Sequence, residues 1–301
     1  QNFSLNELTN IRGIYYDVLG QKDSSKVYFE KALKLSRKFE HLKIEVKCIN
    51  NLGMFCWNNG EFKKALDYFY QALEFSEKHN PKNDKKKSIY LSNIGLIYQE
   101  LQQFEKAIEF HDKALKIRQE YDRKKDISTS YNNLAICYKE FDELEKAEDY
   151  INLAIDYAKD ADQPRLVYKF HDNLGNILNL QGKYQQAEEA YLYSLQTPDD
   201  FQNKLGEKFI TLSNIIDVYY STSQFEKAKK AIADAESLIQ QDSTLFNFSE
   251  SFYINSAKTY FALQQPKKAN AYFENYEMVK DSLFSKENAQ ALADVETKLK
   301  T

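Results

Sequence analysis

Seven copies of one segment, each about forty residues long, account for nearly all of this chain of 301 residues. The segment NLGMFCWNNGEFKKALDYFYQAL begins at Asn51, and close copies of it begin at Asn93, Asn133 and Asn173. We call the third residue of the segment, which is small in most copies, the marker. The markers are Gly13, Gly53, Gly95, Ala135, Gly175, Ile216 and Ala257, with spacings of 40, 42, 40, 40, 41 and 41 residues. Repetition at such a period predicts a solenoid, in which each unit packs on its neighbours.

Further small residues recur at fixed distances from the marker. One follows the marker by twelve positions and another by seven more, as in Gly53, Ala65 and Ala72. The other triplets are Gly95, Ala107, Ala114; Ala135, Ala147, Ala154; and Gly175, Ala187, Ser194. We expect two antiparallel helices joined at a turn such as Asn59-Gly60 or Gln181-Gly182. The first two small residues would then face each other where the helices approach most closely, and the third would admit the next unit.

This pattern resembles the tetratricopeptide repeat, a helix-turn-helix unit with small residues at these three places and aromatic residues between them. The resemblance implies an all-α fold, a right-handed superhelical solenoid of about seven units with a C-terminal capping or linker helix. The units exceed the usual length of about 34 residues, as in kinesin light chains, cell-polarity scaffolds and the peptide-sensing Rap regulators of bacteria. Ser25, Ile216 and Tyr276 depart from the small-residue rule, so the end units are the less regular ones.

We expect the repeat array to span residues 1–276, with units opening near residues 6, 46, 88, 128, 168, 209 and 250. Residues 277–301 would form a C-terminal helix that is cut short at Thr301. The turn from Lys280 to Phe284 resembles the end of the repeat region in sensor histidine kinases and membrane-anchored transcriptional regulators of the Bacteroidetes. That resemblance implies a helix that continues to a transmembrane span and a cytoplasmic signalling domain. An apolar stripe could pack on the last unit or join two copies as a homodimer; it comprises Leu283, Ala289, Leu292, Val295 and Leu299.

Composition narrows the classes of protein and partner. Only 8 Gly and 4 Pro, beside 29% charged and 43% apolar residues, favour amphipathic helices over a sheet. The net charge of −4 without a sustained basic stripe argues against nucleic acid. No apolar run reaches the roughly 18 residues of a membrane helix, so we expect no direct membrane insertion. The three cysteines, Cys48, Cys56 and Cys137, lie in apolar helical patterns and are interpreted as buried thiols. Because the chain begins with Gln1, we expect a processed chain or an excised fragment.

One polar residue recurs in the otherwise apolar first helices, two positions before the marker. We call these residues the ladder asparagines: Asn51, Asn93, Asn133, Asn173, Asn214 and Asn255. They resemble the asparagine ladder of related peptide-binding repeats, which would grip an extended peptide backbone on the concave face. Alternatively, their amides bond the neighbouring helix and fix the spacing of the units. Further candidates for the concave groove lie one turn along: Trp57, Gln99, Lys139 and Asn179.

No residue pattern supports catalysis, a metal or a cofactor. The segment FHDNLGNIL, residues 170–178, resembles a phosphoacceptor box of histidine kinases. Its Asp172-Asn173-Leu174-Gly175 is in register with Asn50-Asn51-Leu52-Gly53, however, so the repeat explains it. His41, His79 and His111 have no partners at metal-ligand spacing and are interpreted as surface or packing residues.

The sequence therefore predicts a non-catalytic module that recognises a protein or an extended peptide in its concave groove. By resemblance, we expect the ligand-sensing region of a bacterial histidine kinase or transcriptional regulator, in an extracytoplasmic or periplasmic location. The alternatives are a free-standing cytoplasmic scaffold and a Rap-like peptide-responsive regulator. A Rap-like regulator would need an additional N-terminal helical bundle, whereas this sequence enters the first repeat almost at Gln1.

Overall fold

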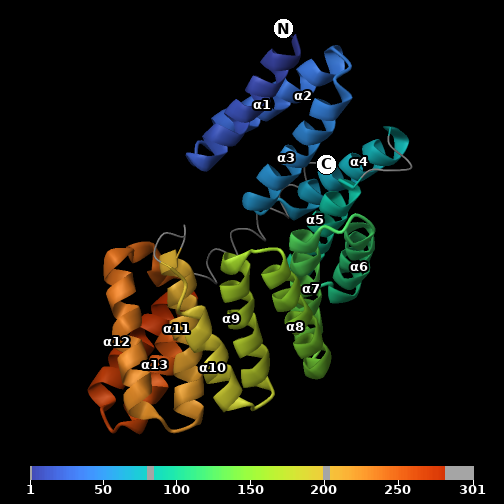
Figure 1. Cartoon of the computed structure of the whole chain (residues 1–301). Coiled ribbons are helices and arrows are strands. Elements are labelled where there is room, and N and C mark those ends of the chain that lie inside the picture. The colour runs from blue at the N-terminus through green and yellow to red at the C-terminus, as the bar shows by residue number, and fades with distance from the viewer. Residues whose placement is uncertain (1, 80–84, 199–203, 282–301) are drawn as a thin grey trace. The chain divides into compact units, whose positions relative to one another are not determined.

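The computed structural model describes residues 2–79, 85–198 and 204–281, and this part of the chain is helical without any strand (Figure 1). The helices are α1 (Asn2–Val18), α2 (Lys22–Lys38), α3 (Leu42–Asn58), α4 (Phe62–His79), α5 (Lys87–Glu100), α6 (Phe104–Glu120), α7 (Lys124–Glu140), α8 (Leu144–Asp160), α9 (Pro164–Leu180), α10 (Tyr184–Ser194), α11 (Lys204–Ser221), α12 (Phe225–Gln241), the short 3-10 helix η1 (Ser243–Phe248) and α13 (Glu250–Ala262). Residues 266–281 are helical as well.

The chain divides into two compact units, residues 1–161 and 162–301. In the first, α1–α8 form four consecutive helix pairs. In the second, α9–α13 and the helix over 266–281 form three. Each odd-numbered helix from α1 to α11 packs mainly on the helix that follows it, and within each unit the second helix of a pair also packs on the next first helix. Each unit thus has the predicted all-α architecture of stacked helix pairs. The predicted boundary after residue 276 falls within the helix over 266–281, and most of the predicted C-terminal helix, residues 282–301, lies outside the described residues.

The turn inside each pair is set by one residue, seven positions after the marker, whose φ is positive. All positive φ values in the described chain lie between 48° and 75°, and the turn residues are among them. These turn residues are Gly20, Gly60, Gln102, Asp142, Gly182, Ser223 and Gln264. A left-handed residue ends a helix by turning the chain, and glycine adopts it without steric cost. The two turns predicted from Gly60 and Gly182 are therefore present, and the other five use the same backbone conformation.

The seam between the paired helices is closed by a side chain sixteen positions after the marker. A Cβ on Gly53 would stand 2.6 Å from the ring of Phe69, and one on Gly95 would stand 2.7 Å from the ring of His111. The marker is therefore small because of the ring sixteen positions after it, and not only because of the small residue twelve positions after it. Ser25 looked irregular in the sequence, but it is fully buried and its hydroxyl donates to the Gly13 carbonyl at 3.0 Å.

The three cysteines are free and buried, as the sequence predicted. Burial raises the pKa of Cys48 and Cys137 to about 12 and that of Cys56 to about 11. Thiols with such pKa values are not nucleophiles at neutral pH. Among the described helices, none combines the length and the apolar character that crossing a membrane requires.

Candidate functional site

The ladder asparagines lie on the first helices of both units. Asn51, Asn93 and Asn133 belong to α3, α5 and α7 of the first unit. Asn173, Asn214 and Asn255 belong to α9, α11 and α13 of the second. Asn133 and Asn255 are buried, with 6% and 8% of their surface exposed, whereas the other four are half-buried. Each therefore stands at the border between the helix packing and the surface of its unit.

Two ladder asparagines connect consecutive first helices. The Asn51 Nδ2 donates to Asn10 Oδ1 at 3.1 Å, and the Asn93 Nδ2 donates to Asn50 Oδ1 at 3.1 Å. The acceptor in each case lies three positions before the marker of the preceding pair. These contacts have the geometry of the structural alternative, in which the amides fix the spacing of the units. An engaged Nδ2 still leaves the amide oxygen with its acceptor lone pairs.

The other ladder asparagines have different surroundings. The Nδ2 of Asn133 is buried and has no hydrogen-bond partner among the described residues. The Oδ1 of Asn255 accepts from Lys258 at 3.2 Å. Asn214 and Thr211 of α11 bond the carboxylate of Asp172 on α9 and thereby oppose the effect of burial on its pKa. The ladder is regular in sequence, but its members make different contacts.

The four further candidates of the groove are already engaged within their units. Trp57 packs on the apolar core around α3 and α4. Gln99 turns inward, where its Oε1 lies 3.0 Å from His111 Nε2 and its Nε2 donates to the Asn133 carbonyl at 3.5 Å. Lys139 pairs with Glu140 at 2.8 Å, and Asn179 donates to Asp217 at 3.0 Å. Gln99, Lys139 and Asn179 thus bond to protein groups of their own units, and Trp57 belongs to the apolar packing.

His111 is a packing residue, as the sequence predicted. It is fully buried on α6, against Gly95 of α5. Burial, with the nearby charge of Arg118 as a smaller cause, lowers the pKa of His111 to about 3. The ring is therefore neutral at physiological pH, with a proton on the nitrogen that faces Gln99 Oε1.

The rejected phosphoacceptor box is part of the repeat packing. The His171 ring lies against that of Tyr193, with centroids 4.1 Å apart. Burial raises the pKa of Asp172, whose carboxylate accepts from Asn176 at 3.4 Å. Asn176 in turn accepts from the Tyr191 hydroxyl at 2.9 Å. In the part of the chain that the structure describes, no group of three or more His, Cys, Asp or Glu residues could hold a metal ion.

Sequence reasoning missed the buried arginine Arg118. Its guanidinium donates to the Asp126 carbonyl at 3.0 Å, to the Ser88 carbonyl at 3.5 Å and to the Ser130 hydroxyl, so it connects α6 to both α5 and α7. Its exposed fraction is 6%, and burial lowers its pKa to about 10. A signal was present in the sequence, because the corresponding residues of the other first-unit pairs are small: Ser36, Ser76 and Ala158.

Comparison with protein families agrees with this architecture. Three family models described as "Tetratricopeptide repeat" match residues 10–39, 46–84 and 87–160. The comparison with curated proteins gave no match.

Several solved structures share the fold. The apo form of RapI has a TM-score of 0.70 at 15% identity, over 93% of this chain and 99% of that chain. NprR in complex with its cognate peptide NprX has a TM-score of 0.62 at 21% identity, over 90% of this chain and 76% of that chain. BtubC (BKLC) from P. vanneervenii has a TM-score of 0.64 at 24% identity, over 73% of this chain and 90% of that chain. At these identities the likeness concerns the fold alone. The matched repeats and the helix pairs together show that the chain belongs to the tetratricopeptide-repeat proteins.

Proposed function

We propose that the chain is a non-catalytic recognition module that binds an extended peptide along the first helices of a unit. The observation that carries the proposal is the ladder of amide side chains, one in each of six helix pairs, at the border between packing and surface. Amide groups repeated along a groove are suited to the backbone of an extended peptide, because each offers a donor and an acceptor. NprR, whose fold is similar and whose structure holds its cognate peptide, supports the proposal.

The contacts of the ladder assign different roles to different amide groups. In Asn51 and Asn93 the Nδ2 fixes the distance to the preceding first helix. Their Oδ1 atoms would accept N–H groups of the ligand. Asn133, whose buried Nδ2 has no partner in the described chain, would donate to a ligand carbonyl. A buried donor without a partner costs about 1–3 kcal/mol, so a ligand carbonyl at this place would recover that free energy.

We place this module in a bacterial signalling protein, as the ligand-sensing region of a histidine kinase or a transcriptional regulator. The resemblance of Lys280–Phe284 to that class supports the proposal, which includes an extracytoplasmic location and a homodimer formed through the C-terminal helix. A free-standing cytoplasmic scaffold is the alternative. A peptide-responsive regulator of the Rap type is a second candidate. The alignment with RapI extends over 99% of that chain, which weakens the argument that this sequence lacks the N-terminal helical bundle of a Rap-like regulator.

Peptides selected on the purified protein from a randomised display library provide the test. We expect selected peptides to bind with saturation in fluorescence anisotropy, and Asn133→Ala to weaken them at least tenfold with a smaller loss of thermal stability than Asn93→Ala causes. A substitution on an exposed second-helix position, Lys116→Ala, is the matched control and should change neither property. If no peptide is selected, or if Asn133→Ala leaves every selected peptide unaffected, the ladder does not bind peptides.

A further inference from the structure

A pair of stacked rings recurs between the two helices of a pair. Its first ring lies three positions after the marker and its second twelve positions later. The pairs are Tyr16–Tyr28, Tyr98–Phe110, Tyr138–Tyr150 and Tyr260–Tyr272, with centroids 5.2, 5.6, 5.2 and 5.3 Å apart and interplanar angles of 20°, 20°, 14° and 8°. The constant register shows that the stack is a property of the repeat.

A lysine eight positions after the first ring covers it in four helix pairs. Lys106 lies 5.1 Å from the Tyr98 centroid, and Lys146 lies 4.4 Å from the Tyr138 centroid. Lys227 over Tyr219 and Lys268 over Tyr260 repeat the arrangement at 5.4 and 5.0 Å. An ammonium over an aromatic face is attracted by the electrons of the ring. The repeat thus has a fixed place for one aromatic ring, between a second ring and a lysine.

The pair α3–α4 keeps two parts of this arrangement and lacks the third. Its lysine is Lys64 and its second ring is Tyr68, but the place of the first ring is taken by Cys56. Among the seven helix pairs, this is the one that has the second ring without the first. The other flank differs too. In α7–α8, Tyr131 lies beside Tyr150 with centroids 5.9 Å apart, whereas α3 has Ile49 at that position.

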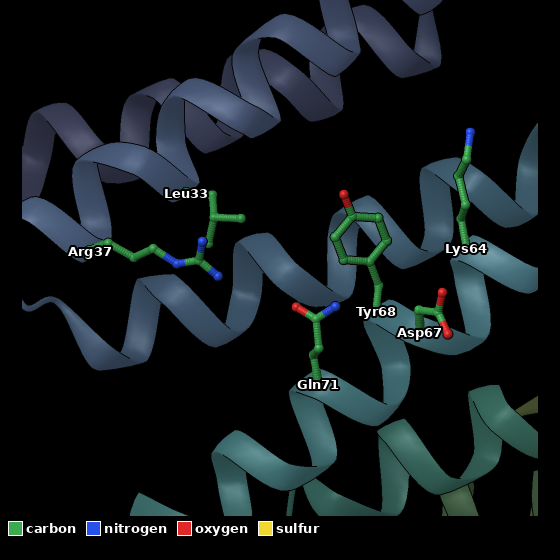
Figure 2. A pocket seen from close by; sticks show the side chains of 6 residues that line it. All are labelled: Leu33, Arg37, Lys64, Asp67, Tyr68 and Gln71. Atoms are coloured by element: carbon green, nitrogen blue, oxygen red, sulfur yellow. The ribbon is translucent and has the colours of Figure 1, made fainter. Parts of the chain in front are cut away.

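A cavity lies beside Tyr68 and Lys64, the two parts of the arrangement that this pair retains. Figure 2 shows it between α2, which contributes Leu33 and Arg37, and α4, which contributes Lys64, Asp67, Tyr68 and Gln71. Its volume is about 340 Å³, within the range of pockets that hold small groups. All six residues belong to the second helices of their pairs, so the cavity is separate from the ladder asparagines on the first helices.

We propose that this cavity is a docking site for a tyrosine side chain of a protein partner. The neighbouring helix pairs specify the contacts of the ring, which would stack on Tyr68 with Lys64 above it, as Tyr138 lies between Tyr150 and Lys146. Arg37 also lines the cavity and would donate to the hydroxyl of the docked ring. In α2 it occupies the position from which Gln119 of α6 donates to a different tyrosine hydroxyl, that of Tyr131, at 3.1 Å.

Arg37 has donors for that hydroxyl. Its Nε bonds Glu45 at 3.0 Å, and a guanidinium carries five N–H groups in all. This site extends the function beyond the peptide proposed for the first helices, because a partner could hold the second-helix face at the same time.

N-acetyl-tyrosinamide is the probe for the cavity, and N-acetyl-phenylalaninamide and N-acetyl-leucinamide are its controls. We expect saturable binding by NMR titration in the order tyrosine, phenylalanine, leucine, with the largest shifts at residues of α2 and α4. Cys56→Tyr would supply the missing ring from within the chain and should abolish binding. Tyr68→Ala should weaken binding at least tenfold.

A second pair of variants tests the hydroxyl contact without touching the core. Arg37→Ala, at a side chain that is 55% exposed, should weaken the tyrosine probe and leave the phenylalanine probe unchanged. Lys34→Ala, an exposed neighbour on α2, is the control and should change neither. The proposal is wrong if the three probes bind alike, or if Tyr68→Ala and Cys56→Tyr fold and bind as before. It is also wrong if no probe binds and Tyr68→Ala instead converts a dimer to a monomer in sedimentation, because the cavity then receives a second copy.

Discussion

The ring of Tyr191 covers Gly175 so closely that a Cβ on Gly175 would stand 2.6 Å from the ring carbon Cε1. The same relation holds, sixteen residues apart, for Gly13 with Phe29, where the distance would be 2.5 Å. In the pair whose marker is Ala135, the residue at that place is the aliphatic Ile151, which is fully buried. The size of the marker and the shape of the side chain over it are therefore coupled.

From this coupling we predict that Gly175→Ala lowers the free energy of unfolding by about 1–3 kcal/mol, because the buried Tyr191 must shift to make room. Urea denaturation measures the change. Combining Gly175→Ala with Tyr191→Ile, the pairing of Ala135 with Ile151, should cost less than the sum of the two single changes. A strictly additive double variant would refute the coupling.

Gly182→Ala is the matched control for the seam. Gly182 has a φ of +74°, and a Cβ there would meet nothing within 4 Å. Its replacement should cost about 1 kcal/mol from the left-handed backbone alone. It should cost the same in the Tyr191→Ile background, because no ring is involved.

The seam between α5 and α6 gives the next prediction. Ala107 is fully buried, twelve residues after Gly95. Ala107→Leu should destabilise the protein by roughly 1–3 kcal/mol, since the added atoms overpack a close helix contact. Lys116→Leu, on the exposed face of the same helix, is the control. A thermal melt that Ala107→Leu leaves unchanged would show that Ala107 is not part of the seam.

The sequence was sufficient for the helix pairs because their signals are local and repeated. Marker, turn and small residues lie at fixed distances, and each reports the same steric condition in unit after unit. Gln102 and Asp142 were harder to identify as turn residues, since a left-handed backbone is enforced there by the flanking helices and not by a glycine.

The candidate site was less predictable for the same physical reason. The ladder is visible as a period, but the contacts of each amide depend on its neighbour in the preceding pair. Asn93 finds Asn50, whereas the Nδ2 of Asn133 has no partner in the described chain. Arg118 and the cavity beside Tyr68 arise where single residues differ from the repeat, so the repeat pattern does not predict them. The right-handed twist, the location and the homodimer stay predictions.

Single substitutions in the ladder should differ in their effect on the free energy of unfolding. Asn93→Ala removes the donor to Asn50 Oδ1, and leaving that partly buried acceptor unsatisfied should cost about 1–3 kcal/mol. Asn133→Ala removes an amide whose Nδ2 has no partner in the described chain and should cost less. Urea midpoints compare the two. A triple variant in which Asn93, Asn133 and Asn173 are all replaced by Ala should also lower the affinity for a peptide if the ladder binds one. Equal losses for Asn93 and Asn133 would contradict the assigned contacts.

The last prediction concerns pH and rests on His111, whose pKa is lowered from 6.5 to about 3 by burial and, to a smaller extent, by Arg118. A histidine with a lowered folded pKa takes up its proton more readily in the unfolded chain. Its contribution to stability is therefore complete above pH 6.5 and is lost as the pH falls from 6.5 towards 3. At pH 5 this loss should amount to about 2 kcal/mol, at 1.4 kcal/mol for each pH unit. His111→Phe supplies the ring that Phe69 provides over Gly53, without a titrating group. We expect urea midpoints of the wild type to fall between pH 7.5 and pH 5 by more than those of His111→Phe. Groups such as Asp172 titrate in both proteins, so the difference between the two isolates the histidine. Equal losses in both proteins would mean that His111 is not held neutral by its burial.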